Sequence, residues 1–435
     1  PGAILEASRN LKPGKEPDTM KRSLLLLPAL ALALAACAPA SPESAAESAT
    51  ESTAAAQDTT PEESTASSTA TSPAGALRDS SILDATDTAL YTITVPTTPL
   101  EPGSTAPLQV LRLDYATAKQ DCVYTVELPV GDDGCIAEAG SLLALDDTLY
   151  LFVGQTMYKI PAGGGTAESL SLEQLFFPTA ADDTCAYSFT FNEGSHYFGS
   201  RLDLATGQIT DLKLPSQTWD IWAVGESRFL LCHLVTDMPL PSVSDGEAYN
   251  AALQVAVCEY EWYDPSTGEL EKVLEEPYYG TDQEDGSKRE RAFLGAADGR
   301  LYFTWRARLD GEVLDAGVES CDFTGGDWQP LDAIPRGDEV TLTWLQNGSL
   351  RWLGDYRDTN SCLIYDLRTG KVAESVPIDD GSPKAFTGDD RVLIDVGYTD
   401  EELAFHEEYQ LAGIDDYLAG STDWTPVTMY SESAS

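Results

Sequence analysis

From about residue 78 to residue 430 the chain alternates between short β-rich apolar runs and polar turns of Gly, Asp and Asn. Patterns with a helical period are nearly absent. Short runs separated by turn residues are typical of an all-β sandwich, barrel or propeller. A body of roughly 350 residues exceeds the size at which a single core stops growing, unless the fold is a closed ring of repeated units.

Two segments show a repeating unit most clearly. Residues 141–170 turn first at Asp146-Asp147, and residues 340–376 turn at Asn347-Gly348 and again at Thr369-Gly370. Each segment reads as four strands, A to D, joined as an antiparallel meander. This unit is one blade of a propeller, and repeats of this length are typical of radial architectures.

Two kinds of turn alternate along the chain. The A–B turn, a polar tip before an apolar pair, occurs at Asp87, Asp147, Glu193-Gly194, Glu226, Asp298-Gly299, Asn347-Gly348 and Asp390. The C–D turn, an apolar residue and Asp before a Thr-Gly corner, occurs at residues 202–207, 263–268 and 365–370. Looser C–D turns begin at Leu113, Ile160, Cys321 and Ile414. Asp bonds turn amides and Gly takes positive φ. The order predicts seven four-stranded blades, with six or eight as alternatives.

This pattern resembles the β-propeller repeats of bacterial surface lipoproteins and of the quinoprotein (PQQ)-like and WD40-like families, over roughly residues 80–430. The tryptophan that those families place after the Thr-Gly corner is mostly missing. Ile209 and Leu270 stand there instead, and only Trp328 and Trp424 lie at comparable places. The resemblance implies the architecture and gives no ground for a quinone, so no cofactor is expected.

A targeting segment precedes the propeller. Met20-Lys21-Arg22-Ser23 is a basic start, and the apolar run from Leu24 to Ala36 holds about 13 residues, where a bilayer span needs roughly 20. Both features are typical of a signal peptide. Leu34, Ala35, Ala36 and Cys37 match the lipobox of bacterial lipoproteins. This resemblance implies cleavage before Cys37, a diacylglyceryl group on its thiol, and a lipid anchor in the cell membrane on the extracytoplasmic side.

Two further segments complete the domain organisation. Residues 1–19 fit no part of a signal peptide, and we expect an overextended gene model whose true start is Met20. Residues 37–78 are almost entirely Ala, Ser, Thr, Glu and Pro. They offer too little apolar surface to offset the entropy of ordering, which predicts a disordered linker. We therefore expect a signal peptide over residues 20–36, a linker over 37–78 and a propeller over 79–431.

The charge of the chain limits its partners. The formal net charge is −46 at pH 7. Such an acidic protein repels nucleic acid and anionic lipid surfaces, so no nucleic-acid partner is expected. Cations, basic peptides and neutral sugars remain, and the alternative is that the charge serves solubility alone. We expect a monomer.

Residues in arrangements typical of catalytic or metal sites are scarce in the sequence. His196, His233 and His406 fall in different predicted blades, and no two of them share a metal-ligand spacing. The Asp doublets all sit beside turns, where Asp serves local hydrogen bonding. The sequence therefore predicts no catalytic residue and no metal site. Cys232 and Cys258 fall on neighbouring predicted strands, where they form a disulfide or remain buried free thiols.

One basic cluster lies where long connections are expected. Antiparallel meanders place B–C loops and D-to-A connections on one face, and loops on a rigid scaffold often bind ligands. The long insertions are Pro96–Pro107, Thr236–Ala252, Glu276–Ala292, Leu309–Gly317 and Tyr398–Glu408. The candidate ligand-binding residues are Lys288, Arg289, Arg291, Arg306 and Arg308, with Tyr278, Tyr279 and Trp305. Arginines hold carboxylate, sulfate or phosphate, and the alternative is charge compensation.

The sequence thus favours a membrane-anchored, extracytoplasmic lipoprotein whose propeller is a binding or interaction scaffold for an unknown protein, peptide or carbohydrate. The alternative is an envelope carbohydrate-active enzyme, a glycoside hydrolase or lyase, on the same fold. The scarcity of catalytic motifs ranks the enzyme second. Predicted inner strands such as residues 141–145 and 340–345 are mostly apolar or neutral, whereas propeller glycosidases place carboxylates there.

Overall fold

A computed structural model divides the chain into two units, Pro1–Ser68 and Thr69–Ser435. The structure describes residues 76–79, 83–96, 100–136, 140–191, 197–238, 240–242, 244–332, 342–344, 352–356, 362–366, 371–374, 382–387, 389–399 and 405–431. The expected signal peptide, Cys37 and most of the expected linker lie outside these residues. Among the described helices, none is long and apolar enough to cross a membrane.

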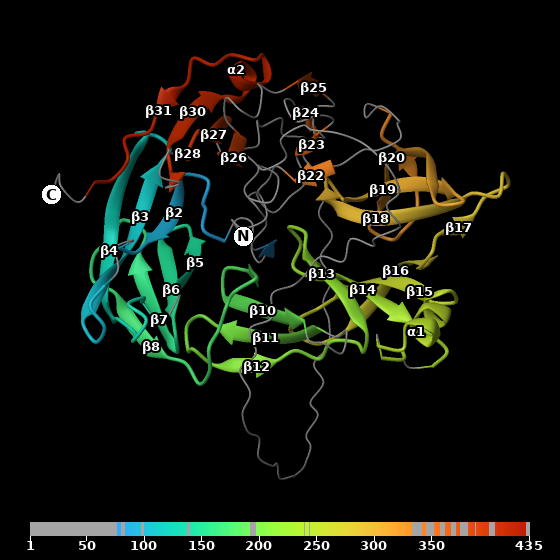
Figure 1. The fold of residues 1–435 in the computed structure, drawn as a ribbon, viewed down its shortest axis with the longest axis horizontal. Coiled ribbons are helices and arrows are strands. Elements are labelled where there is room, and N and C mark those ends of the chain that lie inside the picture. The colour runs from blue at the N-terminus through green and yellow to red at the C-terminus, as the bar shows by residue number, and fades with distance from the viewer. Residues whose placement is uncertain are drawn as a thin grey trace, which may run out of the picture. The chain divides into compact units, whose positions relative to one another are not determined.

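The second unit is an all-β propeller with about six blades of four antiparallel strands (Figure 1). This confirms the predicted fold class. Two blades are simple meanders. One comprises β5 (Gly140–Leu145), β6 (Thr148–Val153), β7 (Thr156–Pro161) and β8 (Glu168–Ser171). The other comprises β13 (Thr218–Ala223), β14 (Phe229–Val235), β15 (Val257–Tyr263) and β16 (Leu270–Pro277).

The sheet between these two blades corrects one predicted turn. It comprises β9 (Ala180–Ala181), β10 (Cys185–Phe191), β11 (Tyr197–Asp203) and β12 (Ile209–Asp211), with β1 (Arg78–Asp79) added beside β9. The first turn of this blade is therefore at Asp182–Thr184, between β9 and β10. The sequence predicts this turn at Glu193-Gly194, which follows β10 in the chain and lies outside the described residues. Because β9 has only two residues, it gave no recognisable apolar run.

The next sheet corrects two predicted loops. It comprises β17 (Thr281–Asp282), β18 (Lys288–Ala297), β19 (Arg300–Leu309), β20 (Glu312–Asp322) and β21 (Gln329–Pro330). Residues 309–317, predicted as a long loop, form a tight turn at Asp310-Gly311 and the first half of β20. Residues 288–292, predicted as part of a connection, begin β18. Charged side chains on β18 and β20 interrupt the alternation of apolar and polar residues by which a strand is recognised in sequence.

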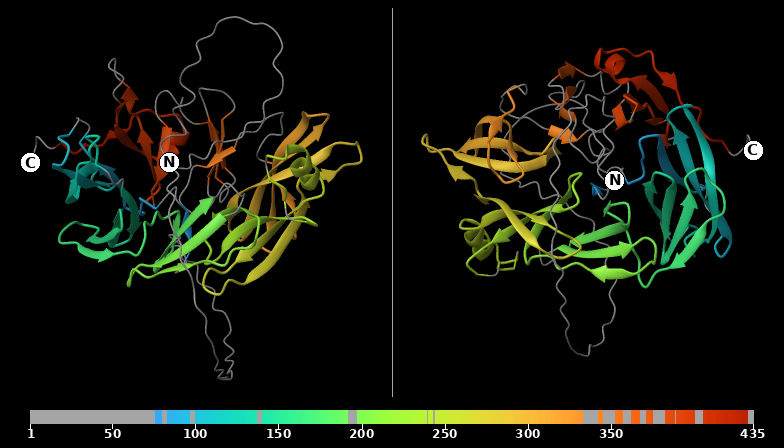
Figure 2. Two further views of the ribbon diagram at one scale, coloured as in Figure 1. Left: turned by 60° about the horizontal axis from the view of Figure 1, so that its bottom comes forward. Right: turned by 180° about the vertical axis from the view of Figure 1, so that it is seen from behind.

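The remaining strands follow in chain order. One sheet comprises β22 (Leu342–Trp344), β23 (Trp352–Tyr356), β24 (Cys362–Asp366) and β25 (Lys371–Glu374). Another comprises β26 (Ser382–Phe386), β27 (Arg391–Asp395), β30 (Tyr409–Gly413) and β31 (Thr425–Pro426), beside a hairpin of β28 (Tyr398–Thr399) and β29 (Phe405–His406). Helix α2 (Ile414–Leu418) follows β30. Helix α1 (Gly246–Leu253) lies in the connection from β14 to β15, close to β15 (Figures 1 and 2).

The last residues of the described chain pair with the first sheet. That sheet comprises β2 (Ala89–Thr94), β3 (Thr105–Asp114) and β4 (Lys119–Pro129). Thr428 bridges Lys119 in parallel. Its N–H donates to the Ala118 carbonyl at 2.9 Å, and its carbonyl accepts from the Gln120 N–H at 2.9 Å. The Tyr430 N–H donates to Gln120 Oε1 at 3.1 Å across 310 sequence positions.

Apolar clusters lie between successive sheets and hold them together. Side chains of β2–β4 pack against β5–β7, and those of β6 and β7 pack against β10 and β11. Further clusters join β10 to β14 and β15, and β14–β16 to β18–β20. The first sheet also packs on the last, through Leu113 and Tyr115 against Leu393 and Leu411. Burial between blades, at about 25 cal/mol per Å² of apolar surface, is thus the main stabilising term.

Two of the three Asp-x-x-Thr-Gly corners, at residues 203–207 and 264–268, fold as predicted, and residues 367–370 of the third lie outside the described part of the chain. Asp203 Oδ1 accepts hydrogen bonds from both the N–H and the Oγ1 of Thr206, each at 2.8 Å. Gly207 and Gly268 take φ of +73° and +77°, a region that favours glycine. The Thr206 bonds also hold the pKa of the Asp203 carboxyl below its usual value. These turns thus owe their Asp and Gly to backbone geometry.

The chain enters the propeller as a short segment that contacts several sheets. Leu77 is fully buried, and its N–H donates to the Glu226 carbonyl at 2.8 Å. Arg78 Nη2 donates to the Ala144 carbonyl at 2.8 Å. Burial lowers the pKa of Arg78, and the carboxylates around it, led by Asp183, oppose that shift. The folded part thus begins before Asp79, inside the stretch assigned to the linker.

Candidate functional site

A polar hollow of about 450 Å³ lies against the sheet of β17–β21. Its lining residues are Gln283, Asp285, Ser287, Arg289, Trp305, Ala307, Leu314, Asp315, Glu319 and Pro330. They come from β18, β19, β20 and β21 and from the connection before β18. Of the predicted ligand-binding residues, Arg289 and Trp305 line the hollow, and its wall carries both acidic and basic groups.

Trp305 is the aromatic surface of this hollow, and its position depends on a glycine. Its side chain stands opposite Gly317 in the β19–β20 register. A Cβ at Gly317 would stand 3.0 Å from Trp305 Nε1, so any larger residue would require the indole or the strand to shift. The Arg289 guanidinium lies over the Trp305 ring, 4.1 Å from the ring centroid. This is the geometry of a cation–π contact.

Two glutamates balance the arginines at this site. Glu319, itself buried, accepts hydrogen bonds from both Arg289 and Arg291. Arg291 also pairs with Glu276, and its guanidinium lies 4.4 Å from the Trp328 ring centroid. Burial raises the pKa of Glu276, and the Arg291 charge opposes that shift. Arg289 and Arg291 are therefore held as a neutral network rather than as a positive patch.

The other predicted binding residues lie apart from the hollow. Lys288 pairs with Arg308 in the register, and Glu290 pairs with Arg306, on the face opposite to Arg289. Lys288 Nζ lies 3.4 Å from Asp282, Arg308 Nε lies 3.3 Å from Glu290, and Arg306 is exposed.

The two tyrosines of the predicted cluster also lie elsewhere. Tyr278 and Tyr279 contact each other edge to face at 5.0 Å and pack on the apolar cluster beneath α1, where Tyr278 meets Trp219. The structure thus unites Arg289, Arg291 and Trp305. The sequence did not indicate Asp315 and Gly317, because residues 309–317 are predicted as a loop, and it did not indicate Glu319. The alternation of β20 from Glu312 onward was the available signal.

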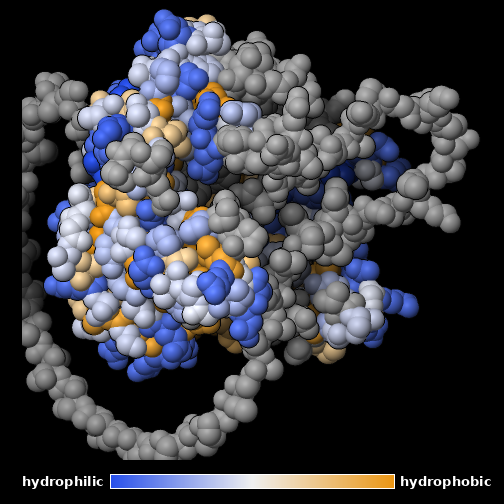
Figure 3. Space-filling view, turned by 60° about the vertical axis from the view of Figure 1, so that its left-hand side comes forward, coloured by the Kyte–Doolittle hydropathy of each residue, from blue (hydrophilic) through white to orange (hydrophobic). Residues whose placement is uncertain are grey.

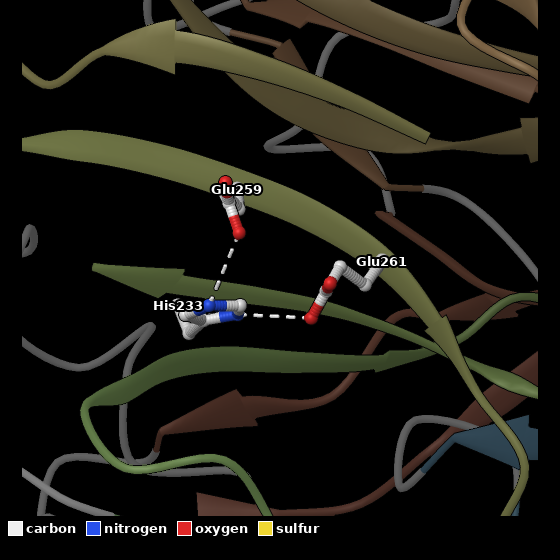
Figure 4. A group of neighbouring side chains, drawn as sticks. All are labelled: His233, Glu259 and Glu261. Carbon is white, nitrogen blue, oxygen red and sulfur yellow. Dashed lines mark ion pairs between the residues drawn. The ribbon is translucent and has the colours of Figure 1, made fainter. Parts of the chain in front are cut away.

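A second group of side chains lies on the neighbouring blade. His233 on β14 faces Glu259 and Glu261 on β15 (Figure 4). His233 Nε2 lies 3.5 Å from Glu259 Oε2, and His233 Nδ1 lies 3.2 Å from Glu261 Oε2. One ligand atom from each residue lies within 4.8 Å of the others. Sequence spacing could not reveal this group, because His233 and the glutamates lie on consecutive strands that a long connection with α1 separates.

This histidine group is shielded from water and borders a hollow. The three side chains are 12–22% exposed. His233 lines a hollow of about 200 Å³ with Pro215, Ser216, Gln217, Leu234, Val235 and Thr236. Burial raises the pKa of Glu261, while His233 opposes that shift. Lys272 Nζ contacts the other oxygen of Glu259, Oε1, at 2.9 Å.

The two cysteines of the same blade are neighbours, as expected from their strands. Cys232 and Cys258 are both free thiols in the structure. The hydrogen bond between them raises the pKa of Cys232 and lowers that of Cys258. Cys232 stands opposite Tyr260 in the register, and Cys258 opposite Leu234, so the two thiols meet diagonally across the strands. Of the two alternatives, the structure has the thiol pair.

The view onto β2–β8 shows a mixed surface, in which apolar residues form small groups among hydrophilic ones (Figure 3). Such mixing is ordinary for solvated protein surface. Neither hollow described above is lined by residues of these strands.

Comparison with known proteins gives structural likeness only. No family model matches the chain, and no curated protein matches it. A solved oligogalacturonate lyase from Vibrio parahaemolyticus has a TM-score of 0.37 at 10% identity, covering 78% of this chain and 85% of the lyase. TolB from Acinetobacter baumannii has a TM-score of 0.29 at 12% identity, with coverage of 75% and 77%.

The WD40 domain of Neurospora crassa Pan2 is a third such structure, with a TM-score of 0.32 at 10% identity, covering 76% of this chain and 94% of that domain. At TM-scores this low, these likenesses add nothing to the assignment of the fold. The propeller assignment rests on the pairing of the strands.

Proposed function

We propose that this protein is an extracytoplasmic lipoprotein, anchored through Cys37, whose propeller is a binding scaffold with its ligand site in the hollow beside Trp305. The observation that carries the proposal is the composition of that hollow. The indole of Trp305, 7% exposed, lines one side, and Asp285, Asp315 and Arg289 supply hydrogen-bonding groups around a space of about 450 Å³. Ligand sites are concave and combine an aromatic surface with a few placed polar groups.

The charge of the hollow favours a ligand rich in hydroxyl groups, such as an oligosaccharide. Arg289 and Arg291 are paired with Glu319 and Glu276, so little positive charge remains to hold a sulfate or phosphate. Carboxylates and guanidinium groups together accept and donate hydrogen bonds, as a neutral sugar requires. Among the partners proposed from the sequence, a carbohydrate therefore fits this hollow best.

The finer count of seven blades is part of the same proposal. The strands of the first sheet, β2–β4, are preceded by a short bridge between Ala85 and Leu90. If the segment around Ala85 is counted as a fourth strand, the first sheet becomes a seventh blade beside the other four- and five-stranded sheets. Its packing on the last sheet supports a ring that closes between the chain's two ends.

The alternative function, an envelope carbohydrate-active enzyme, has less support at this hollow. Glycosidases need two carboxyl groups, one of which keeps its proton as the general acid. Hydrogen bonds from Ser287 lower the pKa of Asp285, and Glu319 is bonded to two arginines. These carboxylates suit binding better than proton transfer.

The test is a binding screen of neutral and acidic oligosaccharides on the purified protein, followed by calorimetry. We expect Asp315→Asn to weaken binding about tenfold or more, since it removes a charged acceptor at the wall. Asp310→Asn is the matched control, because Asp310 is an exposed turn residue outside the hollow. Equal loss in both variants, or no binding by any sugar, contradicts the proposal. Shorter products after incubation support the enzyme instead.

The anchor has its own test. In a bacterial expression host, the protein is expected in the membrane fraction with an intact mass that begins at Cys37 and includes the lipid. Cys37→Ala is expected to release it or leave the precursor uncut. A precursor that retains residues 1–36, or membrane retention that is unchanged in Cys37→Ala, contradicts the anchor without affecting the sugar site.

A further inference from the structure

We infer that His233, Glu259 and Glu261 form a binding site for one divalent transition-metal ion of the Zn²⁺ type. Strand pairing brings these residues together. Glu259 stands opposite His233 in the β14–β15 register, and Glu261 stands opposite Leu231, two positions along the same face. All three side chains therefore project to one side of the sheet, which antiparallel pairing requires of residues with this spacing.

The donor set matches the chemistry of such an ion. Zn²⁺ takes imidazole nitrogen and carboxylate oxygen, and sites with three protein ligands leave a fourth position for water or another ligand. One donor atom from each residue lies within 4.8 Å of the other two. Each ring nitrogen of His233 faces one glutamate, at 3.2 and 3.5 Å, so an ion bound to either nitrogen has a carboxylate oxygen beside it.

Unsatisfied atoms at the group point to a ligand. His233 Nδ1 and Glu261 Oε2 are both buried and lie 3.2 Å apart, yet neither forms a hydrogen bond. Leaving buried polar atoms without a hydrogen bond costs free energy. An ion held by one of these atoms would remove that cost. Lys272 leaves the site open, since it binds Glu259 through Oε1 while Oε2 faces His233.

The surroundings of the group include a hollow and a negative electrostatic field that attracts cations. His233 lines the hollow of about 200 Å³ together with residues 215–217 and 234–236, so the group borders a space that can hold water. The group is negative, because the carboxylates of Glu259 and Glu261 outnumber the single ammonium group of Lys272. The net charge of −46 on the chain adds a field that draws cations to it.

A competing arrangement has the same residues without a metal. A protonated His233 would then lie between two carboxylates as a pair of ion pairs. The two arrangements differ in a measurable way, because only the metal site takes up one ion per chain and gives Co²⁺ the absorption of a low-coordinate nitrogen and oxygen site. The site is also independent of the sugar-binding proposal, since it shares no residue with the hollow beside Trp305.

The experiment is titration of the purified, chelator-treated protein with Zn²⁺ by calorimetry and with Co²⁺ by absorption, in excess Mg²⁺ to occupy loose acidic sites. We expect one ion per chain. His233→Gln and Glu261→Gln are expected to weaken binding at least about tenfold, since even outer partners of metal ligands change affinity by about 10–100-fold. Glu275→Gln is the matched control, because Glu275 contacts the same Lys272 but is not part of the group.

Each outcome decides the proposal. One tight Zn²⁺ ion in the wild type and in Glu275→Gln, lost in either ligand variant, supports it. No uptake by the wild type in excess Mg²⁺, or the same affinity in Glu261→Gln as in the wild type, overturns it. Glu261→Gln keeps the shape of the side chain, so it serves as the test if His233→Gln fails to fold.

Discussion

The indole of Trp305 lies against the backbone of Gly317 on the neighbouring strand, 3.0 Å from where a Cβ would stand. This contact fixes the aromatic surface of the candidate binding hollow. It also explains a glycine in the middle of β20, where glycine is otherwise unfavourable in a strand. The position of Trp305 therefore gives a direct way to disturb the hollow without touching its charged groups.

We predict that Gly317→Ala displaces the indole and weakens ligand binding. The added methyl would stand 3.0 Å from Trp305 Nε1, and overpacking of this kind costs about 1–3 kcal/mol. The emission of Trp305 should shift, and the urea midpoint should fall. Gly163→Ala is the control, because a Cβ at Gly163 meets nothing within 4 Å. An unchanged midpoint in Gly317→Ala would show that β20 adapts to the methyl at no cost.

We predict that Glu319→Gln is strongly destabilising. Glu319 is 7% exposed and accepts from both Arg289 and Arg291. Breaking a buried ion pair by removing one partner costs about 3–5 kcal/mol. Glu290→Gln is the matched comparison on the same sheet: its pair with Arg308 is more exposed, at 39% and 33%, and such pairs are worth about 0–1 kcal/mol. Equal urea midpoints for the two variants would refute this ranking.

We predict that Asp220 makes the protein less stable as pH rises. Burial raises the pKa of Asp220 to about 6 from its usual 3.8. Between these values the folded state holds a proton that the unfolded chain has released, so stability falls as pH rises from about 4 to about 6. The difference corresponds to about 3 kcal/mol. Asp220→Asn should therefore stabilise the protein at pH 7.5 and change little at pH 4, as urea unfolding at both values will measure.

Asp203→Asn is the comparison of opposite sign. The hydrogen bonds from Thr206 lower the pKa of Asp203, so its carboxylate stabilises the turn at neutral pH and stops doing so as pH falls through its folded pKa. The variant should be less stable than the wild type at pH 7.5. If both substitutions act in the same direction at pH 7.5, burial of Asp220 is not the governing effect.

We predict that Thr428→Pro loosens the closure of the first sheet. The Thr428 N–H donates to the Ala118 carbonyl at 2.9 Å, and proline has no N–H to donate. The cost should be about 1–3 kcal/mol, with faster amide exchange in β4. Thr428→Ala keeps the N–H and removes only an exposed side chain, so it should behave as the wild type. Equal exchange rates in the two variants would rule out a role for this hydrogen bond.

Most of what the sequence could predict about the fold came from its turn residues. Asp and Gly mark hairpins by local chemistry, so the strands around 141–170 and the corners at Gly207 and Gly268 agree with the structure. The prediction was wrong where that signal weakened. The two-residue β9 left no apolar run, and charged residues on β20 resembled a loop.

Side-chain partnerships were harder to predict, because they depend on strand register. The sequence grouped eight residues by nearness along the chain, yet register separates Lys288 from Arg289 onto opposite faces. It also joins His233 to Glu259, which lie on different strands. Alternation within one strand is visible in sequence, but the partner opposite each residue is set by turn geometry and bulges.

The pairing of Gln120 with Tyr430 has a consequence for how the protein is made. The first sheet lacks this neighbour until residue 430 leaves the ribosome, 310 positions after Gln120. At about 5–20 residues per second, that interval is roughly 15–60 s. Throughout it, the backbone groups of Ala118 and Gln120 at the start of β4 are open to any other strand, including that of another nascent copy. Synthesis of residues 428–430 is thus the step that covers these groups.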